Sequence, residues 1–273
     1  MAYEAILYDK HEHVAVLTLN KPERLNAIGN AVREEVHQAV EAAREDDDVR
    51  ALIITGTGRG FCSGADLSGG AAAAAAAAGR DPDAVGPQNT RLDEDGWVGR
   101  WARRFHSFDK PLIGAINGVA AGAGMSMAMA CDIRVGSEMS RFKAVFIERS
   151  LSPDSGLSYF LPRVIGYARA ADLLFTSRAV NGEEAYRLGL LDRLVPHEAL
   201  LEESIKLANE MTQWPPLALR MTKRVLQHSF EADFEEAIRY ESVGLGFARK
   251  APHDVRESRL SFTEKRKPKY TGA

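Results

Sequence analysis

The chain has 273 residues, of which 45% are hydrophobic and 27% charged, and its formal net charge is −3. This length allows one large domain or two small ones with a substantial core. The weak negative charge gives no electrostatic reason to expect a nucleic acid or a membrane surface as partner. No apolar run is long enough to span a bilayer and no secretory signal is evident, so we expect a cytoplasmic protein. Cys62 and Cys131 lack metal-ligand spacing, which predicts reduced thiols and no metal site.

The first half of the chain alternates apolar segments with amphipathic ones. Residues 6–8 and 14–19 are predicted strands, and the apolar spacing over residues 32–43 predicts a helix. Residues 51–54 form a short, wholly apolar strand. Wholly apolar strands that alternate with amphipathic helices indicate an α/β fold with a sheet buried on both faces. Residues 56–66 are then a loop leaving a buried strand, where open α/β sheets usually bind ligands.

Two segments follow before the centre of the chain. Residues 69–89 contain an alanine octet followed by glycines and prolines, which predicts a mobile insertion or a short exposed helix beside the ligand pocket. The spacing of Trp97, Trp101, Phe105 and Phe108 predicts an amphipathic helix. We interpret this aromatic stripe as core packing.

The centre of the chain is a strand that leads into a helix through small residues. Residues 112–116 are a predicted strand, a turn follows at Asn117, and a helix ends near Cys131. Glycines at such a junction let a ligand approach the backbone, and the first turn of a helix offers unpaired N–H groups. The junction could therefore hold developing negative charge. On this stretch alone, tight helix packing explains the small residues equally well.

The second half of the chain changes from α/β to helical. Residues 141–147 are a predicted strand, and a turn at residues 152–156 leads into a helix. The later predicted helices cover residues 168–175, 182–188, 198–211, 216–227 and 230–247. We therefore predict an α/β core over residues 1–199 and a helical region over residues 200–273. The last helices are so apolar that we expect another subunit to bury part of their surface.

Five motifs together resemble one family. The segment from Asn117 to Asp132 resembles the central signature of the crotonase (enoyl-CoA hydratase/isomerase) superfamily. The segment from Gly58 to Leu67 resembles that family's first oxyanion and adenine-binding loop. Further matches occur at residues 19–27, 183–195 and 262–266, in the family's order. The resemblance implies a crotonase (ClpP/crotonase-like) fold of stacked ββα units with a C-terminal α-helical trimerisation region. It also implies an acyl-CoA substrate, no further cofactor, and a homotrimer or dimer of trimers.

The resemblance also implies the residues of the site. The backbone N–H groups of Ala65 and Ala123 match the two donors that stabilise the thioester enolate, and each such donor is worth roughly 10²–10³ in rate. Residues matched to coenzyme A binding are Ser63, Asp66 and Leu67 around the adenine, Arg24 near the phosphates, and Phe262 with Lys265, a pair often contributed by a neighbouring subunit.

The sequence departs from the hydratase pattern of this family. Hydratases use two glutamates to hold and activate water, and these should fall at Ser126 and at about Phe146. Neither residue can act as a base. Glu148 is two residues further along the predicted strand, some 6–7 Å away, and does not replace the second glutamate. The pattern therefore disfavours a standard hydratase.

Asp154 is the remaining candidate base. Its Ser-Pro-Asp-Ser-Gly context matches an aspartate of several isomerase branches of the family. Its alternative role is to cap the helix that follows. We predict double-bond isomerisation through an enolate, with Asp154 as base. The alternatives are a hydratase or hydrolytic activity that uses Asp154, and an acyl-CoA-binding protein without catalysis.

Overall fold

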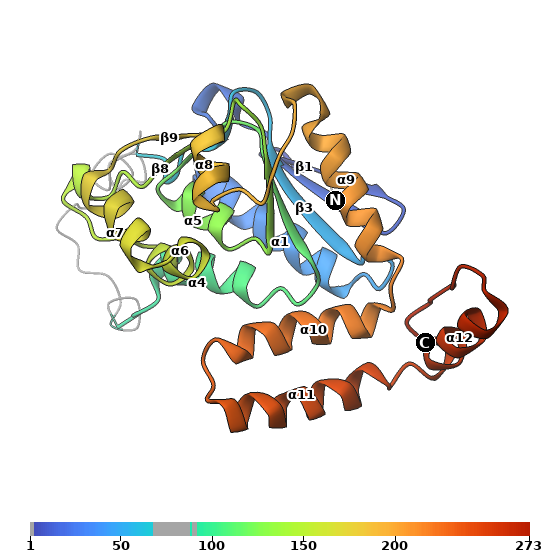
Figure 1. The fold of residues 1–273 in the computed structure, drawn as a ribbon. Helices are drawn as coiled ribbons and strands as arrows, with labels where there is room; N and C mark the ends of the chain where they lie inside the picture. The colour runs from blue at the N-terminus through green and yellow to red at the C-terminus, as the bar shows by residue number, and fades with distance from the viewer. Residues whose placement is uncertain (1–2, 68–87, 89–91) are drawn as a thin grey trace.

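A six-stranded sheet crosses the centre of the computed structural model, which describes residues 3–67, 88 and 92–273 (Figure 1). Its strand order is β1-β2-β3-β5-β7-β10, and all neighbours except β1 and β2 run parallel. A smaller sheet has the order β4-β6-β8-β9. The strands are β1 (Ile6–His11), β2 (Val14–Leu19), β3 (Ala51–Gly56), β4 (Gly60–Cys62), β5 (Leu112–Ile116), β6 (Val119–Ala121), β7 (Ile133–Gly136), β8 (Arg141–Lys143), β9 (Val180–Asn181) and β10 (Arg193–Leu194).

Helices cover both sheets and continue beyond them. The α-helices are α1 (Asn30–Glu45), α4 (Gly96–His106), α5 (Ala123–Met129), α6 (Leu157–Ile165), α7 (Tyr167–Thr176), α8 (Gly182–Leu188), α9 (Leu200–Thr212), α10 (Pro216–Ser229), α11 (Phe234–Ala248) and α12 (Pro252–Glu264). Short 3-10 helices cover Pro22–Arg24, Ile147–Arg149 and His197–Ala199. Within the described residues, no helix combines the length and apolar character needed to cross a membrane.

The central sheet is buried on both faces, as the wholly apolar strands predict. On one face, Val14 and Val16 of β2 pack with buried residues of α9 such as Leu207. On the other face, Ala15 and Leu17 pack into a larger core. Adjacent residues of a strand point to opposite faces, so a strand covered on both sides must be apolar throughout.

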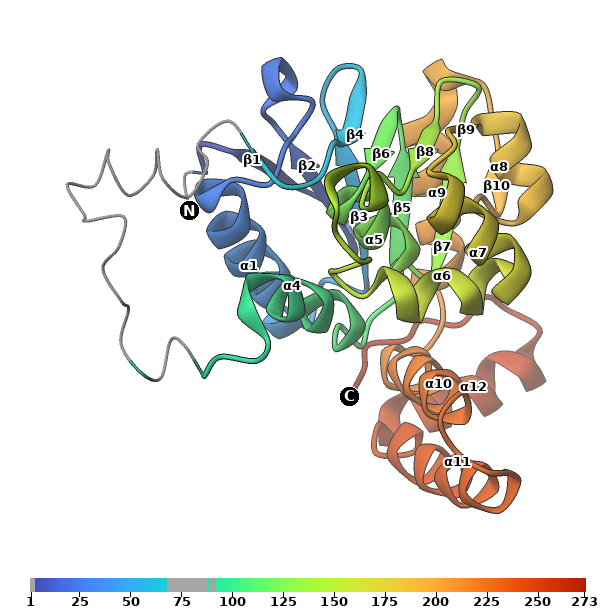
Figure 2. The same cartoon turned by 90° about the vertical axis from the view of Figure 1, so that its left-hand side faces the viewer.

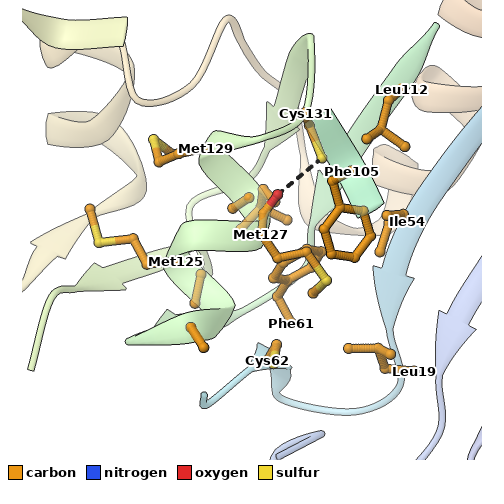
Figure 3. Packing of buried hydrophobic residues seen from close by; sticks show 14 of the residues in the cluster. Leu19, Ile54, Phe61, Cys62, Phe105, Leu112, Met125, Met127, Met129 and Cys131 are labelled. Atoms are coloured by element: carbon orange, nitrogen blue, oxygen red, sulfur yellow. Dashed lines mark hydrogen bonds between the residues drawn. The ribbon is translucent and has the colours of Figure 1, made fainter. Parts of the chain in front are cut away.

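Helix α5 lies in this larger core, between the two sheets and α6 (Figures 2 and 3). All seven of its residues are buried, and Met127 points toward Phe61 of β4 and Phe105 of α4, whereas Met125 and Met129 lie on the other side of the helix (Figure 3). The Sγ of Cys131 donates to the carbonyl oxygen of Met127 at 3.4 Å (Figure 3). Cys131 and Cys62 are free thiols, and burial raises the pKa of each to about 12. Both thiols therefore stay protonated.

The C-terminal arm, residues 216–273, carries α10, α11 and α12 away from the sheets (Figures 1 and 2). Its last residues return to the core, where Arg50 donates to the carbonyl oxygen of Tyr270 at 2.8 Å. Ion pairs attach α10 to the core, because Lys223 lies 2.7 Å from Asp132 and both Arg220 and Arg224 bind Asp109. Helix α9 behaves differently, since its buried face belongs to the central sheet. The division at residues 199 and 200 stays a prediction, and the packing places α9 with the core.

Four details differ from the sequence predictions. Strand β8 ends at Lys143 rather than at residue 147, because Val145 has a left-handed backbone with φ of 60°. The predicted loop over residues 56–66 contains strand β4. Helix α11 begins at Phe234, after Asp233 caps it, rather than at residue 230. Helix α12 was not predicted, and the expectation for residues 69–89 lies outside the described residues, except at Gln88.

Candidate active site

Two glycine contacts bring the segment after β4 against the start of α5. At Gly64, where φ is +93°, an added Cβ would lie 2.8 Å from the oxygen of Ala121 and 3.4 Å from the nitrogen of Ala123. At Gly124, an added Cβ would lie 2.0 Å from the carbonyl oxygen of Cys62. A side chain at either position would force the two segments apart. Close backbone approach, rather than helix packing alone, explains the small residues here.

Ala65 lies beside this junction, and its N–H points away from Ile28. Ala65 forms an isolated parallel bridge with Ile28, in which the nitrogen of Ile28 donates to Gly64 at 2.7 Å and Asp66 donates to Ile28 at 3.2 Å. In such a bridge the flanking peptide groups make the bonds, and the central residue's own N–H points to the opposite side. Ala65 lines the same pocket as Ala121, Gly122 and Ala123.

The second donor is the N–H of Ala123. Ala123 is the first residue of α5, and its N-cap, Gly122, provides no side-chain cap. The first N–H groups of a helix have no partner within the helix. Within the described residues no backbone bond from the N–H of Ala123 is formed, so this group is available to an oxygen, and the helix orientation favours negative charge there.

Two buried asparagines fix the loop that presents Ala65. The side chain of Asn26 donates to the carbonyl oxygens of Thr57 at 3.0 Å and Gly60 at 2.7 Å. Asn117 donates to Gly58 at 3.0 Å and accepts from the nitrogen of Gly56 at 3.1 Å. Neither residue was among the site residues predicted from the sequence. Asn26 lies in the motif of residues 19–27, and Asn117 begins the motif that ends at Asp132. Both are directly beside turns, where an amide side chain can form hydrogen bonds with backbone groups of the loop.

Asp154 lines the same pocket from the segment before α6. Its Oδ1 is buried and has no hydrogen-bond partner among the described residues. Burial raises the pKa of the carboxyl group, and the Ser155 side chain opposes the shift in part. The N-cap of α6 is Gly156, and no side chain caps this helix. The structure therefore does not use the Asp154 carboxylate as a helix cap. A half-buried carboxylate with a raised pKa is suited to take up a proton.

The segment that leads to Asp154 is held in unfavourable backbone conformations. Val145, Ser150 and Ser155 have φ values of 60°, 54° and 53°. Left-handed backbone is uncommon outside glycine and unfavourable for a β-branched residue such as valine. Such conformations concentrate at functional sites, where surrounding structure enforces them.

The two positions expected for hydratase glutamates are apolar or fully buried. Phe146 lines the pocket as an aromatic ring, and Ser126 is 0% exposed. Glu148 lies on the Ile147–Arg149 3-10 helix, so its predicted place on a strand was wrong. Its carboxylate is exposed and pairs with Lys143 at 2.7 Å. Glu148 is directed into this ion pair and is not among the residues that line the pocket.

The pocket combines backbone donors, apolar side chains and Asp154. Among the described lining residues Asp154 is the carboxylate, and Arg149 supplies a positive charge. The lining residues are Ser63, Gly64, Ala65, Leu67, Ala121, Gly122, Ala123, Val145, Phe146, Arg149, Leu151 and Asp154. No group of three or more His, Cys, Asp or Glu side chains suited to a metal occurs in the part of the chain that is described. The expectation of no metal and no further cofactor stays a prediction.

The residues predicted to bind coenzyme A fall into two groups. Ser63 and Leu67 line the pocket, and the Ser63 hydroxyl donates to the carbonyl oxygen of Arg24 at 3.1 Å. Arg24 and Asp66 are exposed beside them. Phe262, which is 86% exposed, and Lys265 lie at the end of α12, in the arm and away from the pocket (Figure 1). Within one chain, the structure does not bring this last pair to the site.

The model of the enoyl-CoA hydratase/isomerase family matches residues 9–273. The chain belongs to this family. It is 34% identical over 271 residues to the crotonyl-CoA hydratase of Syntrophomonas wolfei, with 99% of each chain covered. It is 32% identical over 270 residues to the 1,2-epoxyphenylacetyl-CoA isomerase of Escherichia coli, with 98% of this chain and 99% of the relative covered.

The fold comparison agrees with the family. The structure of an enoyl-CoA hydratase from Bacillus anthracis superimposes with a TM-score of 0.85 at 27% identity, covering 99% of this chain and 100% of that one. The predicted crotonase fold and superfamily are therefore confirmed. The chain is an enzyme of the enoyl-CoA hydratase/isomerase family.

Proposed function

We propose that the protein isomerises the double bond of an enoyl-CoA thioester, with Asp154 as the base. The observation on which this depends is a pocket with two backbone donors and, among its described lining residues, one carboxylate. Proton removal next to a thioester carbonyl moves charge onto the oxygen. The N–H groups of Ala65 and Ala123 would hold that oxygen, and Asp154 would take the proton and return it at another carbon.

One carboxylate is enough for this reaction and too few for the hydratase arrangement. A base that removes a proton can hand the same proton back, so an isomerase needs no second group to orient water. Ser126 and Phe146 occupy the positions expected for the two glutamates, and neither can activate water. The pocket wall of Phe146, Leu151 and Val145 is apolar and favours exclusion of water.

The other candidate is a hydratase in which Asp154 activates water. Relatives named as hydratases favour it, including the crotonyl-CoA hydratase, which is 34% identical. An acyl-CoA-binding protein without catalysis is a third candidate, and the intact donor pair argues against it.

The experiment compares two substrates and two variants. The purified protein is assayed spectrophotometrically with hex-3-enoyl-CoA for isomerisation and with crotonyl-CoA for hydration. We expect isomerisation to exceed hydration clearly. Asp154→Asn should lower isomerase turnover by about 10²–10⁴-fold with nearly unchanged acyl-CoA affinity.

Glu148→Gln is the matched control, because Glu148 is a nearby carboxylate outside the pocket lining. It should keep its turnover. An Asp154→Asn variant with wild-type turnover, or hydration that matches isomerisation, would contradict the proposal. Acyl-CoA binding without turnover in the wild type would favour the non-catalytic candidate.

We propose further that coenzyme A binds along Ser63, Asp66 and Leu67, and that the protein forms homotrimers or dimers of trimers in the cytoplasm. The exposed apolar side chains of the arm support assembly, with Phe230 64% and Phe234 75% exposed. In such an assembly Phe262 and Lys265 would reach coenzyme A in a neighbouring subunit. Arg24 would lie near the phosphates.

A further inference from the structure

Ser126 contacts both halves of the active site through one hydroxyl group. The residue is 0% exposed, and its Oγ lies 3.3 Å from the carbonyl oxygen of Gly122 and 3.1 Å from that of Asp154. The carbonyl of Gly122 and the N–H of Ala123 belong to the same peptide unit. The carbonyl of Asp154 belongs to the residue that provides the carboxylate.

We propose that Ser126 is a positioning residue, whose hydroxyl fixes the Ala123 donor and the Asp154 base in one arrangement. The inference rests on the proposed function, because it needs Asp154 to act as the base. Ser126 stands where the hydratase pattern has a catalytic glutamate. The same place in the fold then orders the site instead of reacting with the substrate.

The bond to Asp154 is the more informative of the two. A serine in a helix often donates to the carbonyl four residues before it, as Ser126 does with Gly122. The bond to Asp154 joins residues 28 positions apart and connects α5 to the segment before α6. A local bond from Leu157 to the same carbonyl, at 3.0 Å, does not connect the segment to α5.

The segment around Asp154 needs such a connection. Oδ1 of Asp154 has no hydrogen-bond partner among the described residues, and Ser155 has a left-handed backbone with φ of 53°. An unfavourable conformation persists only when its surroundings enforce it. The hydroxyl has one proton, so the two carbonyl oxygens share it, and the nearer oxygen is that of Asp154. The share donated to the Gly122 carbonyl polarises that peptide and strengthens the N–H of Ala123 as a donor.

The test compares two buried helical serines. Ser204 in α9 is also 0% exposed and donates to the carbonyl four residues before it, Leu200, at 2.7 Å, but α9 lies outside the pocket. With hex-3-enoyl-CoA as substrate, Ser126→Ala should lower kcat about 10-fold and change KM less than about twofold. Ser204→Ala should leave both constants unchanged. Ser126→Thr, which keeps the hydroxyl, should recover most of the lost kcat.

A double variant shows whether Ser126 acts through the base. In an Asp154→Asn background, the effect of Ser126→Ala should shrink to about threefold or less, because part of its role requires the carboxylate. The same 10-fold loss in both backgrounds would overturn the inference, as would a threonine variant as slow as the alanine variant. If Ser126→Ala keeps wild-type kcat while Asp154→Asn is slow, the inference alone is wrong. If Asp154→Asn keeps wild-type turnover, the proposed function itself is wrong.

Discussion

The pocket region and the C-terminal arm differ in how closely they are packed. Around the pocket, segments meet at backbone distance, and Gly124 leaves no room for a methyl group against Cys62. In the arm, residues 216–273, large apolar side chains such as Phe230, Phe234 and Leu245 remain exposed. The pocket region is defined by close backbone contact within the chain, whereas the arm has large apolar side chains that this chain does not cover.

The two regions also differ in what holds them in place. The pocket depends on buried amides and on backbone donors, such as Asn26, Asn117 and the N–H of Ala123. The arm attaches through charged side chains, including the pairs of Lys223 with Asp132 and Arg220 with Asp109. Leu226 of α10 stays 59% exposed, so part of the apolar surface of this helix remains available to another molecule.

The largest expected effect comes from replacing a glycine by alanine in the pocket region and comparing it with the same replacement in the arm. Gly124→Ala places a methyl group 2.0 Å from the oxygen of Cys62, so α5 must move. We expect a loss of roughly 3 kcal/mol or more in the free energy of unfolding and a fall in turnover of about 10²-fold. Thermal denaturation and the isomerase assay measure these effects.

Gly246→Ala is the matched substitution in the arm. An added Cβ at Gly246, within α11, meets no atom within 4 Å. Because alanine favours helix over glycine, we expect a gain of roughly 1 kcal/mol. A loss of stability instead would show that a neighbouring subunit covers this part of α11. A Gly124→Ala variant as stable as the wild type would contradict the close backbone packing that distinguishes the pocket region from the arm.

A smaller effect should follow from placing a charge on an exposed aromatic position, once in the arm and once outside it. Phe234 in the arm is 75% exposed and Phe175 in α7 is 69% exposed. If the arm is a subunit interface, Phe234→Asp should convert a trimer to smaller species at micromolar concentration, because a charge would have to be buried there. Phe175→Asp should leave the assembly intact. Light scattering coupled to gel filtration measures both, and a wild-type monomer would contradict the premise.

The smallest expected effect concerns pH and the Asp154 carboxyl group. Burial raises the pKa of this group, so the folded state favours its protonated form. The ionised carboxylate therefore lowers the free energy of unfolding at neutral pH. This loss of stability disappears as the pH falls to the ordinary pKa of an aspartate, because the group is then protonated in both the folded and the unfolded state. Asp154→Asn should be slightly more stable than the wild type at pH 7 and equal to it below about pH 4. Turnover of the wild type should fall as acid protonates the base. A mutant less stable than the wild type at pH 7 would contradict this sign.

The sequence by itself determined the family, the α/β character of the core and the main motifs. Wholly apolar segments such as residues 51–54 predicted strands buried on both faces, because a strand covered on each side has no polar face. The order of the motifs identified the crotonase fold, and the small residues at Gly122 and Gly124 marked the strand-to-helix junction. These features are local or periodic, so they can be read without knowing which segments meet.

The tertiary structure decided what depends on contacts between distant segments. The left-handed backbone of Val145 ends β8 at Lys143, although valine itself favours a strand. The hydroxyl of Ser126 meets the carbonyl of Asp154 across 28 residues, and no spacing in the sequence indicates that bond. The position of Phe262 and Lys265 is likewise set by the arm, which extends away from its own pocket. Local preference fixes elements and motifs, whereas side-chain contacts between distant segments determine how they form a site.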